Sequence, residues 1–345
     1  MKRMAINGFG RIGRTSLRVW YEKHRHESEI VAINTSGSME IEDWAHLLKY
    51  DSNYGIWEIE VAVEPERKTS EVTDEEPRLG WFMVGGKKIA VLAQRDPAKL
   101  PWKDMEIDTV IESTGIFVSR EKAKAHLDAG AQHVVISAPP KGDDLGTFVL
   151  GVNKPIDNDI LSNASCTTNC VAPVTAIIHA NFHVKKAIMS TIHSYTDDQN
   201  LQDNSHRDMR RARNAARNII PTSTGAAVSV TETIPELKGL FDGVSYRVPT
   251  PVGSIADMVF VVEKSTTVEE VNQSLIDASA SERWAGLLAC SNEPLVSSDI
   301  VGRSESSIVD LALTQVIDGD LVKVVSWYDN EWGYCNRLIE QSTQI

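Results

Sequence analysis

The feature that most constrains this 345-residue sequence is a short apolar strand that runs directly into three glycines. Residues 3–7 have the pattern of a buried strand, and they are followed by Gly8-Phe9-Gly10-Arg11-Ile12-Gly13 and a helical stretch to about Lys23. Glycines at this spacing, between a strand and a helix, allow a pyrophosphate to approach backbone N–H groups at the helix N-terminus. The segment therefore predicts a dinucleotide-binding Rossmann unit, and a glycine-rich turn without function fits this context poorly.

The rest of the chain shows two different patterns of strands and helices. In the first half, apolar strand patterns alternate with helical ones, which is typical of a mostly parallel sheet covered on both faces. The strand patterns lie at 29–34, 88–92, 109–112 and 133–136, and the helical ones at 46–50 and 119–129. From Cys166 onward a helix over 166–179 precedes longer strands at 187–193, 254–262 and 321–328. The overall class is α/β.

These two patterns of strands and helices predict a dinucleotide-binding domain over 1–165 and an α+β catalytic domain over 166–329 with a mainly antiparallel sheet. Residues 330–345 are expected to form a C-terminal helix that packs back on the first domain, and the charged segment 69–80 to be a surface excursion.

Composition narrows the possible functions. The net charge of −13 argues against nucleic acid as the main partner, because non-specific binding needs basic surface to neutralise phosphates. No apolar run reaches the roughly 20 residues of a membrane span, and the N-terminal residues lack a signal-peptide core. Four cysteines in a chain of this length do not form a disulfide framework. A cytoplasmic location is expected.

The end of the second strand bears on the choice of cofactor. NAD enzymes usually place an acid there to bind the ribose 2′-OH. This chain has Thr35-Ser36-Gly37-Ser38 instead, and the next carboxylate is Glu40. Hydroxyls and a glycine suit a 2′-phosphate, which a carboxylate would repel. The pattern favours NADP, although Thr35 and Ser36 forming a simple turn beside NAD stays open as an alternative.

Cys166 stands at the start of an apolar helix, within Ser162-Asn163-Ala164-Ser165-Cys166-Thr167-Thr168-Asn169-Cys170. A helix N-terminus favours negative charge, so the thiol is expected to have a lowered pKa and to act as a nucleophile. The alternatives are a structural thiol or a metal pair with Cys170. A Cys-x-x-x-Cys pair without further ligands is poor zinc spacing, so no metal is expected and Cys170 should pack within the helix.

Further motifs follow in an order that makes the sequence resemble type I phosphorylating glyceraldehyde-3-phosphate dehydrogenases over nearly its whole length. Besides the glycine turn and the segment around Cys166, the motifs are Leu47-Leu48-Lys49-Tyr50-Asp51-Ser52, Glu112-Ser113-Thr114-Gly115, Val135-Ile136-Ser137-Ala138-Pro139, Thr191-Ile192-His193-Ser194-Tyr195-Thr196, Ile219–Ala227, Arg247-Val248-Pro249-Thr250-Pro251 and Ser326-Trp327-Tyr328-Asp329-Asn330-Glu331.

The resemblance implies a role for each motif. Cys166 would attack the aldehyde, His193 would move the protons, and inorganic phosphate would cleave the resulting thioester. The implied phosphate-binding residues are Thr196 and Arg247 for the substrate, and Ser165, Thr167, Arg211, Thr224 and Gly225 for inorganic phosphate. The implied cofactor residues are Gly8, Gly10, Arg11, Ile12, Gly13, Thr35, Ser36, Ser113, Thr114, Gly115, Ser205 and Asn330. The family also implies a homotetramer.

Departures from the family pattern concern the cofactor. NAD-specific relatives carry Asp where this chain has Thr35, and commonly Leu-Pro at Asn204-Ser205. Photosynthetic NADP-using relatives have a small residue followed by Ser there, and a neighbouring subunit supplies that Ser to the 2′-phosphate. NADP is therefore the expected cofactor, with NAD use left open. The pattern does not explain Asp197 or Val228.

Two other functions compete with this one. Erythrose-4-phosphate dehydrogenase shares the nucleophile but hydrolyses its thioester, and the intact set Thr167, Arg211, Thr224 and Gly225 favours the phosphorylating enzyme. A primary role in RNA binding or scaffolding fits poorly with an acidic chain. The physiological direction, glycolytic or biosynthetic, stays open, although NADPH would suit the biosynthetic one.

Overall fold

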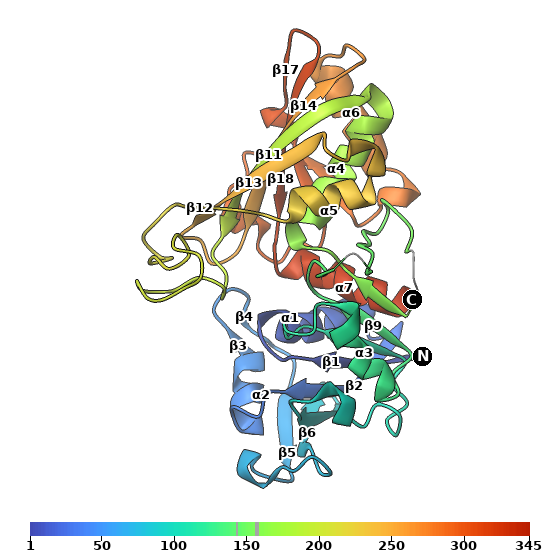
Figure 1. The fold of residues 1–345 in the computed structure, drawn as a ribbon, viewed down its shortest axis with the longest axis vertical. Helices are drawn as coiled ribbons and strands as arrows, with labels where there is room; N and C mark the ends of the chain where they lie inside the picture. The colour runs from blue at the N-terminus through green and yellow to red at the C-terminus, as the bar shows by residue number, and fades with distance from the viewer. Residues whose placement is uncertain (143, 156–158) are drawn as a thin grey trace. The chain divides into compact units, whose positions relative to one another are not determined.

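A computed structural model describes residues 1–142, 144–155 and 159–345 (Figure 1). The chain forms two compact units. Unit 1 contains Met1–Gly146, Pro155–Asn163 and Cys335–Ile345, and unit 2 contains Thr147–Lys154 and Ala164–Tyr334. The last helix, α7 (Trp332–Gln344), therefore begins in unit 2 and continues in unit 1.

Unit 1 is built on an eight-stranded sheet with the order β10-β9-β8-β1-β2-β7-β6-β5. Its parallel strands are β1 (Lys2–Asn7), β2 (Ser28–Thr35), β7 (Lys87–Ala93), β8 (Thr109–Glu112), β9 (His133–Ile136) and β10 (Ile160–Ser162). The antiparallel edge is β6 (Arg78–Val84) and β5 (Val61–Pro65). Strand order reverses direction between β1 and β8, and in open α/β sheets ligands bind at the carboxyl ends of the strands beside such a reversal.

The helices of unit 1 are α1 (Arg11–Val19), extended by a π-helical turn at Trp20–His24, α2 (Ile41–Lys49) and α3 (Arg120–Asp128). A small hairpin of β3 (Tyr50–Asp51) and β4 (Gly55–Ile56) follows α2, and single 3₁₀ turns lie at Thr69–Glu71 and Pro97–Lys99. The sequence predicts α3 well because Ser119 is an N-cap whose hydroxyl accepts the Lys122 N–H.

Unit 2 contains a second, mainly antiparallel sheet with the order β12-β13-β11-β14-β18-β16-β15, and β17 pairs with β18. Its strands are β11 (Val184–Ser194), β12 (Ile220–Thr222), β13 (Phe241–Val248), β14 (Ser254–Val262), β15 (Leu288–Ser291), β16 (Ser307–Asp310), β17 (Gln315–Ile317) and β18 (Leu321–Tyr328). Its helices are α4 (Cys166–Phe182), α5 (Ala226–Thr233) and α6 (Val268–Ser279), with 3₁₀ turns at Pro235–Leu237, Glu282–Trp284, Ser297–Ile300 and Leu311–Leu313.

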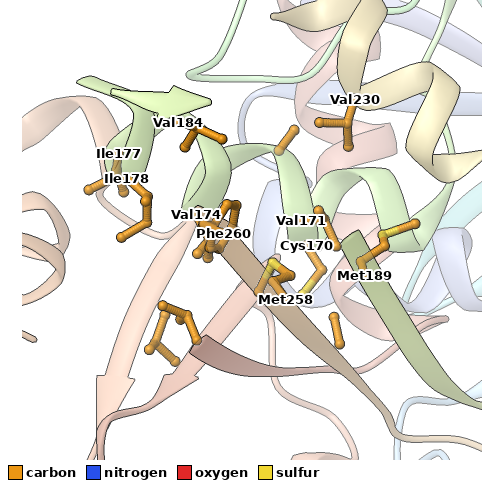
Figure 2. Packing of buried hydrophobic residues seen from close by; sticks show 14 of the residues in the cluster. Cys170, Val171, Val174, Ile177, Ile178, Val184, Met189, Val230, Met258 and Phe260 are labelled. Carbon is orange, nitrogen blue, oxygen red and sulfur yellow. The ribbon is translucent and has the colours of Figure 1, made fainter. Parts of the chain in front are cut away.

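Helix α4 forms the centre of the unit 2 core. It is apolar around most of its circumference, as expected for a helix that is buried on several sides. Figure 2 shows Val171 and Val174 of α4 in the same cluster as Met189 of β11 and Phe260 of β14. Because this packing holds α4 firmly against the sheet, the first residue of the helix, Cys166, has a defined position relative to β11.

The predicted α/β class, with a mostly parallel first sheet and a mainly antiparallel second one, is confirmed. Strands β8, β9, β14 and β18 have the predicted bounds. The excursion predicted over 69–80 is wrong at its end, because Arg78 already begins β6 and Leu79 is fully buried. The helical pattern predicted at 46–50 ends at Lys49, and the chain continues as β3.

Candidate active site

The glycine turn after β1 has the geometry of a phosphate-binding loop. Gly8 has a φ of +97°, and a Cβ there would lie 2.7 Å from the backbone nitrogen of Thr114. A Cβ on Gly13 would collide with the Gly8 carbonyl oxygen, so both positions require glycine. Gly10 is different, because nothing lies within 4 Å of its Cβ position and it makes no side-chain cap at the start of α1. The amino end of α1 thus has room for an anionic ligand.

The other predicted residues of this turn have structural partners. Arg11 Nη1 donates to Asp51 Oδ2 at 2.5 Å, which contributes to the lowered pKa of that carboxyl group. The Ile12 carbonyl accepts from Cys335 Sγ of α7 at 3.6 Å. The loop after β8 lies directly against the turn, since Ser113 Oγ donates to the Gly8 carbonyl at 2.7 Å. The structure thus brings the predicted cofactor residues of β1, α1 and β8 together.

The end of β2 presents hydroxyls, but not all of them are available. Thr35 is buried, and its Oγ1 donates to the Leu92 carbonyl at 3.0 Å. Ser36 and Ser38 are both exposed, with 2.8 Å between their hydroxyl oxygens. The nearest downstream acid, Glu40, is bound instead by the backbone and hydroxyl of Thr69, and these hydrogen bonds lower its pKa. Accessible hydroxyls at this strand end therefore belong to Ser36 and Ser38.

A sharp turn places Cys166 at the start of α4. Ala164 adopts a left-handed backbone conformation with a φ of +56°, which is uncommon for a residue with a Cβ. Ser165 then caps the helix, because its Oγ accepts the Thr168 N–H at 3.0 Å. The turn leaves Cys166 partly exposed at the first helical position. Cys170 is buried in the core, as predicted.

Cys166 and His193 form a pair in which the hydrogen bonds identify the nitrogen that can accept the thiol proton. The distance between Cys166 Sγ and His193 Nε2 is 3.4 Å. His193 Nδ1 lies 2.7 Å from the Ser194 carbonyl oxygen, which can only accept, so Nδ1 carries the proton. In neutral His193 the other nitrogen, Nε2, is then a base facing the thiol. The pair has the geometry required for a cysteine nucleophile activated by a general base.

Electrostatics at this pair differ from the sequence-based expectation. Burial raises the pKa of Cys166, and the opposing effects of Arg247 and of hydrogen bonds at the helix start are smaller. Burial also lowers the pKa of His193 to about 4. The expected lowering of the thiol pKa is therefore wrong for the resting pair, since loss of solvation outweighs the helix terminus. At neutral pH the two side chains are a thiol and an imidazole base.

We expect His193→Asn to shift the alkylation of Cys166 to higher pH. Proton transfer from Cys166 to His193 creates a thiolate beside an imidazolium, and the attraction between them favours the thiolate. Without the imidazolium the apparent thiol pKa should rise by about 1 to 3 units. The check is the pH dependence of the iodoacetamide reaction rate. His183→Asn, an exposed position with a φ of +54° that Asn tolerates, is the control. An unchanged pH profile in His193→Asn would show that the two groups are not coupled.

Two arginines of unit 2 form a connected group with hydroxyls. Arg247 pairs in register with His193 across β13 and β11, and its Nη1 donates to Thr196 Oγ1. Arg211 Nε donates to Thr222 Oγ1 at 2.9 Å. Guanidinium groups beside hydroxyls are suited to bind phosphate through charge-assisted hydrogen bonds. The structure thus brings Thr196 and Arg247 into contact, as the predicted substrate-phosphate site requires.

The predicted residues for inorganic phosphate are only partly brought together. Gly225 is exposed at the start of α5, with open space at its Cβ position, and Thr224 Oγ1 accepts the Ala226 N–H at 3.1 Å. Thr167 Oγ1 is instead 2.9 Å from the Tyr328 hydroxyl, in a buried position. Ser165 Oγ caps α4. These last two hydroxyls therefore have structural partners of their own.

Asp198 is a site residue that sequence reasoning missed. Its carboxylate accepts from Thr196 Oγ1 and from Arg211 Nη1, and Oδ1 lies 3.8 Å from Arg247 Nη1. It therefore links the two predicted phosphate sites and offsets part of their positive charge. The only available signal was an acid two residues after Thr196. Nothing in the structure explains the exposed Asp197 or Val228.

The side-chain amide of Asn330 is held through its oxygen. Its Oδ1 accepts from Ser194 Oγ at 2.9 Å, from the Gly253 N–H at 3.1 Å and from Ser254 Oγ at 3.1 Å. Three donors on one oxygen fix the orientation of the amide, so that Nδ2 is its donor face on the opposite side. Ser205 lies on the exposed 195–219 loop between β11 and β12, where its N–H donates to Asn204 Oδ1 at 2.8 Å.

The family models agree with this arrangement. Residues 2–120 match the model described as glyceraldehyde 3-phosphate dehydrogenase, NAD binding domain, and residues 165–330 match the model of the C-terminal domain of the same enzyme. The chain is also 50% identical to glyceraldehyde-3-phosphate dehydrogenase 2 of Trichormus variabilis over 344 residues, which is 99% of this chain and 97% of that protein. The chain belongs to the glyceraldehyde-3-phosphate dehydrogenase family.

Two further members of this family show how widely the similarity extends. The chloroplastic glyceraldehyde-3-phosphate dehydrogenase A of Chlamydomonas reinhardtii is 47% identical over 341 residues, covering 98% of this chain and 87% of that protein. Glyceraldehyde-3-phosphate dehydrogenase 2 of Streptomyces arenae is 48% identical, covering 99% and 98%. In the described parts of the chain, the helices are all too short or too polar to cross a bilayer.

Proposed function

We propose that this family member catalyses the reversible phosphorylating oxidation of D-glyceraldehyde 3-phosphate to 1,3-bisphosphoglycerate, with NADP as the preferred cofactor and NAD also accepted. The observation that carries the proposal is the 3.4 Å contact between Cys166 Sγ and the unprotonated Nε2 of His193. In this proposal residues 1–165 and 330–345 hold the cofactor, and residues 166–329 carry the catalytic groups.

The chemistry at Cys166 proceeds in two halves. His193 Nε2 takes the thiol proton while Sγ bonds to the aldehyde carbon, and the imidazolium then passes that proton to the former aldehyde oxygen, which gives the hemithioacetal its hydroxyl group. His193 then removes that hydroxyl proton as the carbon loses hydride, which leaves a thioester on Cys166. When bound, the nicotinamide ring accepts the hydride. An oxygen of inorganic phosphate finally attacks the thioester carbon, and the Cys166 thiolate leaves.

Charged groups near the pair provide the two anion sites. Arg247 and Thr196 would bind the phosphate that the substrate carries, and Arg211 with Thr224 and Gly225 would bind inorganic phosphate. Asp198 holds these groups in place and must exchange its hydrogen bonds when anions bind. The oxyanion of the hemithioacetal would be stabilised by the Cys166 N–H and by the Nε2–H of the His193 imidazolium, which forms when His193 takes the thiol proton.

The residues of each unit fit a dinucleotide. In unit 1, Gly10 leaves room beside the amino end of α1, which suits a pyrophosphate. In unit 2, the fixed amide of Asn330 can donate through Nδ2 to the nicotinamide carboxamide. The hydroxyls of Ser36 and Ser38, and the absence of an acid at Thr35, support NADP use. The resemblance to photosynthetic NADP-using relatives, and the similarity to a chloroplastic enzyme, support the same cofactor.

We expect a homotetramer. Ile188, on the outward side of β11, is 58% exposed, and the 195–219 loop exposes Leu201, Met209 and Ile219. Large apolar side chains exposed on this strand and the loop after it support a surface that binds other protein chains. Sedimentation should give a particle of four chains. A stable, fully active monomer would remove both the assembly and the role of Ser205 from a neighbouring subunit.

The function is tested by steady-state kinetics that compare glyceraldehyde 3-phosphate with erythrose 4-phosphate and NADP+ with NAD+. Each combination is measured in the presence and in the absence of inorganic phosphate. Turnover of glyceraldehyde 3-phosphate should depend on inorganic phosphate, and kcat/KM with NADP+ should equal or exceed that with NAD+. Erythrose 4-phosphate as the better substrate, oxidised without phosphate, would favour erythrose-4-phosphate dehydrogenase instead. A cytoplasmic location stays a prediction. A preference for NADPH would suit the biosynthetic direction.

A further inference from the structure

A line of buried polar residues crosses the carboxyl ends of four neighbouring strands in unit 1. It consists of the side chains of Asn34, one residue before the end of β2, Asn7, which ends β1, and Glu112, which ends β8, together with the backbone of Gln94, which follows β7, and we call it the amide–carboxylate ladder. Asn7 is the register partner of both Asn34 and Glu112. All four residues are at most 7% exposed. The predicted cofactor residues Gly8, Thr35 and Ser113 directly follow Asn7, Asn34 and Glu112 in the chain.

Hydrogen bonds connect every step of this ladder. The Gln94 N–H donates to Asn34 Oδ1 at 2.9 Å, and Asn34 Nδ2 donates to the Gln94 carbonyl at 2.8 Å. Asn34 Nδ2 also donates to Asn7 Oδ1 at 2.7 Å. Asn7 Nδ2 donates to Glu112 Oε2 at 2.5 Å. The amide oxygen of Asn7 accepts from Asn34, and its amide nitrogen donates to Glu112. From Asn34 onward every hydrogen bond is therefore donated in the same direction, toward the carboxylate.

Glu112 is an acceptor at both of its oxygens. Oε1 accepts from the Thr114 N–H at 2.8 Å and from the Thr114 hydroxyl, while Oε2 accepts from Asn7 and lies 3.0 Å from His126 Nε2. Trp102 Nε1–H, which can only donate, is 3.0 Å from His126 Nδ1. The His126 proton is therefore on Nε2 and is donated to Glu112. In this arrangement both oxygens of Glu112 act as acceptors, and His126 Nε2 is one of their donors.

The carboxylate holds the loop that covers the glycine turn. Thr114 is fixed to Glu112 by two hydrogen bonds, and its Oγ1 in turn accepts the Ile116 N–H at 3.1 Å. Ser113 is fixed from the other side, because its N–H donates to the Asn7 carbonyl at 2.8 Å and its Oγ to the Gly8 carbonyl. No space remains between Gly8 and this loop. A shift of Glu112 would therefore move both loops.

We propose that Glu112 is a positioning residue for the dinucleotide. Glu112 fixes the loops after β1, β2 and β8 in the positions relative to one another that cofactor binding requires. The proposal rests on the proposed function only in that the unit binds a nicotinamide dinucleotide. Charge-assisted hydrogen bonds are stronger than neutral ones, and a fully satisfied buried network rigidifies what it connects. Glu112 itself need not touch the cofactor.

Glu112→Gln tests the proposal, because an amide cannot accept at both ends. The introduced amide can accept from Thr114 through its oxygen, but its NH₂ group would then face two other donors, Asn7 Nδ2 and His126 Nε2. His126 cannot reverse its tautomer, since Trp102 donates to its other nitrogen. One unsatisfied buried group should raise the Kd for NADP+ about 5- to 150-fold. The kcat at saturating cofactor and the KM for the aldehyde should stay within about twofold of wild type.

The double variant Asn7→Asp with Glu112→Gln provides the rescue. The introduced carboxylate can accept from Asn34, from the introduced amide and from His126 Nε2, which lies 3.3 Å from Asn7 Nδ2, while the oxygen of that amide accepts from Thr114. Each donor thus has an acceptor, although His126 now donates to residue 7, and the charge is moved by one position. The Kd for NADP+ should return to within about threefold of wild type. Ile89→Val and Ile89→Ala, in the fully buried core of β7, serve as controls with a matched loss of melting temperature.

If Glu112→Gln does not fold, the same titration on Trp102→Phe applies. This variant removes the donor to His126 together with part of a fully buried ring, and it should raise the Kd about 2- to 10-fold. The proposal is overturned if these variants leave the Kd unchanged, if the double variant folds without rescue, or if the Ile89 controls lose cofactor binding equally. Wild-type protein that binds neither NADP+ nor NAD+ would instead contradict the proposed function.

Discussion

Cys166→Ser should abolish dehydrogenase turnover while leaving the fold and cofactor binding intact. Serine can occupy the first position of α4 after the Ser165 cap, so the helix should form normally. Its hydroxyl is a far weaker nucleophile than a thiolate at neutral pH, and kcat should fall by about four orders of magnitude or more. The measurements are single-turnover kinetics, circular dichroism and NADP+ titration on the same preparation.

The matched control is Cys290→Ser, at a partly exposed cysteine on β15. It should retain wild-type activity. Iodoacetamide should label Cys166 well before Cys290, since Cys290 also has a pKa raised by burial but has no imidazole beside it. Cys170 and Cys335 are fully buried and should react last. Appreciable turnover by Cys166→Ser would mean that the covalent mechanism is wrong.

Thr35→Asp should shift the preference from NADP+ toward NAD+. The Thr35 hydroxyl now donates to the Leu92 carbonyl, and a carboxylate would have to turn away from that oxygen. It would then point toward the Gly37 N–H and a bound ribose, where it can accept from the ribose diol but repels a 2′-phosphate. Repulsion and a lost charge-assisted contact together amount to about 2–4 kcal/mol, or roughly 30- to 1,000-fold in the ratio of kcat/KM values.

Thr35→Asn separates charge from shape, because it has nearly the same size as Asp without the negative charge. It should change the kcat/KM ratio by much less. Ser205→Pro should weaken NADP+ more than NAD+, by a smaller factor than Thr35→Asp, because it removes a single hydroxyl toward the cofactor, along with the N–H that donates to Asn204 Oδ1. A wild-type enzyme that strongly prefers NAD+ would show that Thr35 does not determine the cofactor.

Local sequence patterns were sufficient to delimit β8, β9, β14 and β18. β8 and β14 could be delimited because runs of apolar residues end abruptly at polar ones. β13 was missed because Gly243 and Arg247 interrupt its pattern and much of its length is only partly buried. The start of β6 was missed because its first residue, Arg78, continues a charged segment.

The candidate site shows a similar division. The glycine turn, Cys166 and His193 are recognisable because their neighbours in sequence carry the signal. Asp198 was missed because it is recognisable only from its ion pairs with Arg211 and Arg247, which are distant in sequence and are brought near it by the fold. The thiol pKa was wrongly expected to be low because a helix N-terminus is a local feature, whereas burial depends on the packing of the whole unit.

Trapping the acyl-enzyme tests the central claim most directly. The protein is mixed with glyceraldehyde 3-phosphate and NADP+ in buffer without phosphate, and its intact mass is recorded before and after phosphate is added. We expect one acyl group per chain, mapped to Cys166, which phosphate discharges rapidly as an acyl phosphate. No adduct on Cys166, or an adduct that water removes as fast as phosphate does, would contradict phosphorylating catalysis through this cysteine.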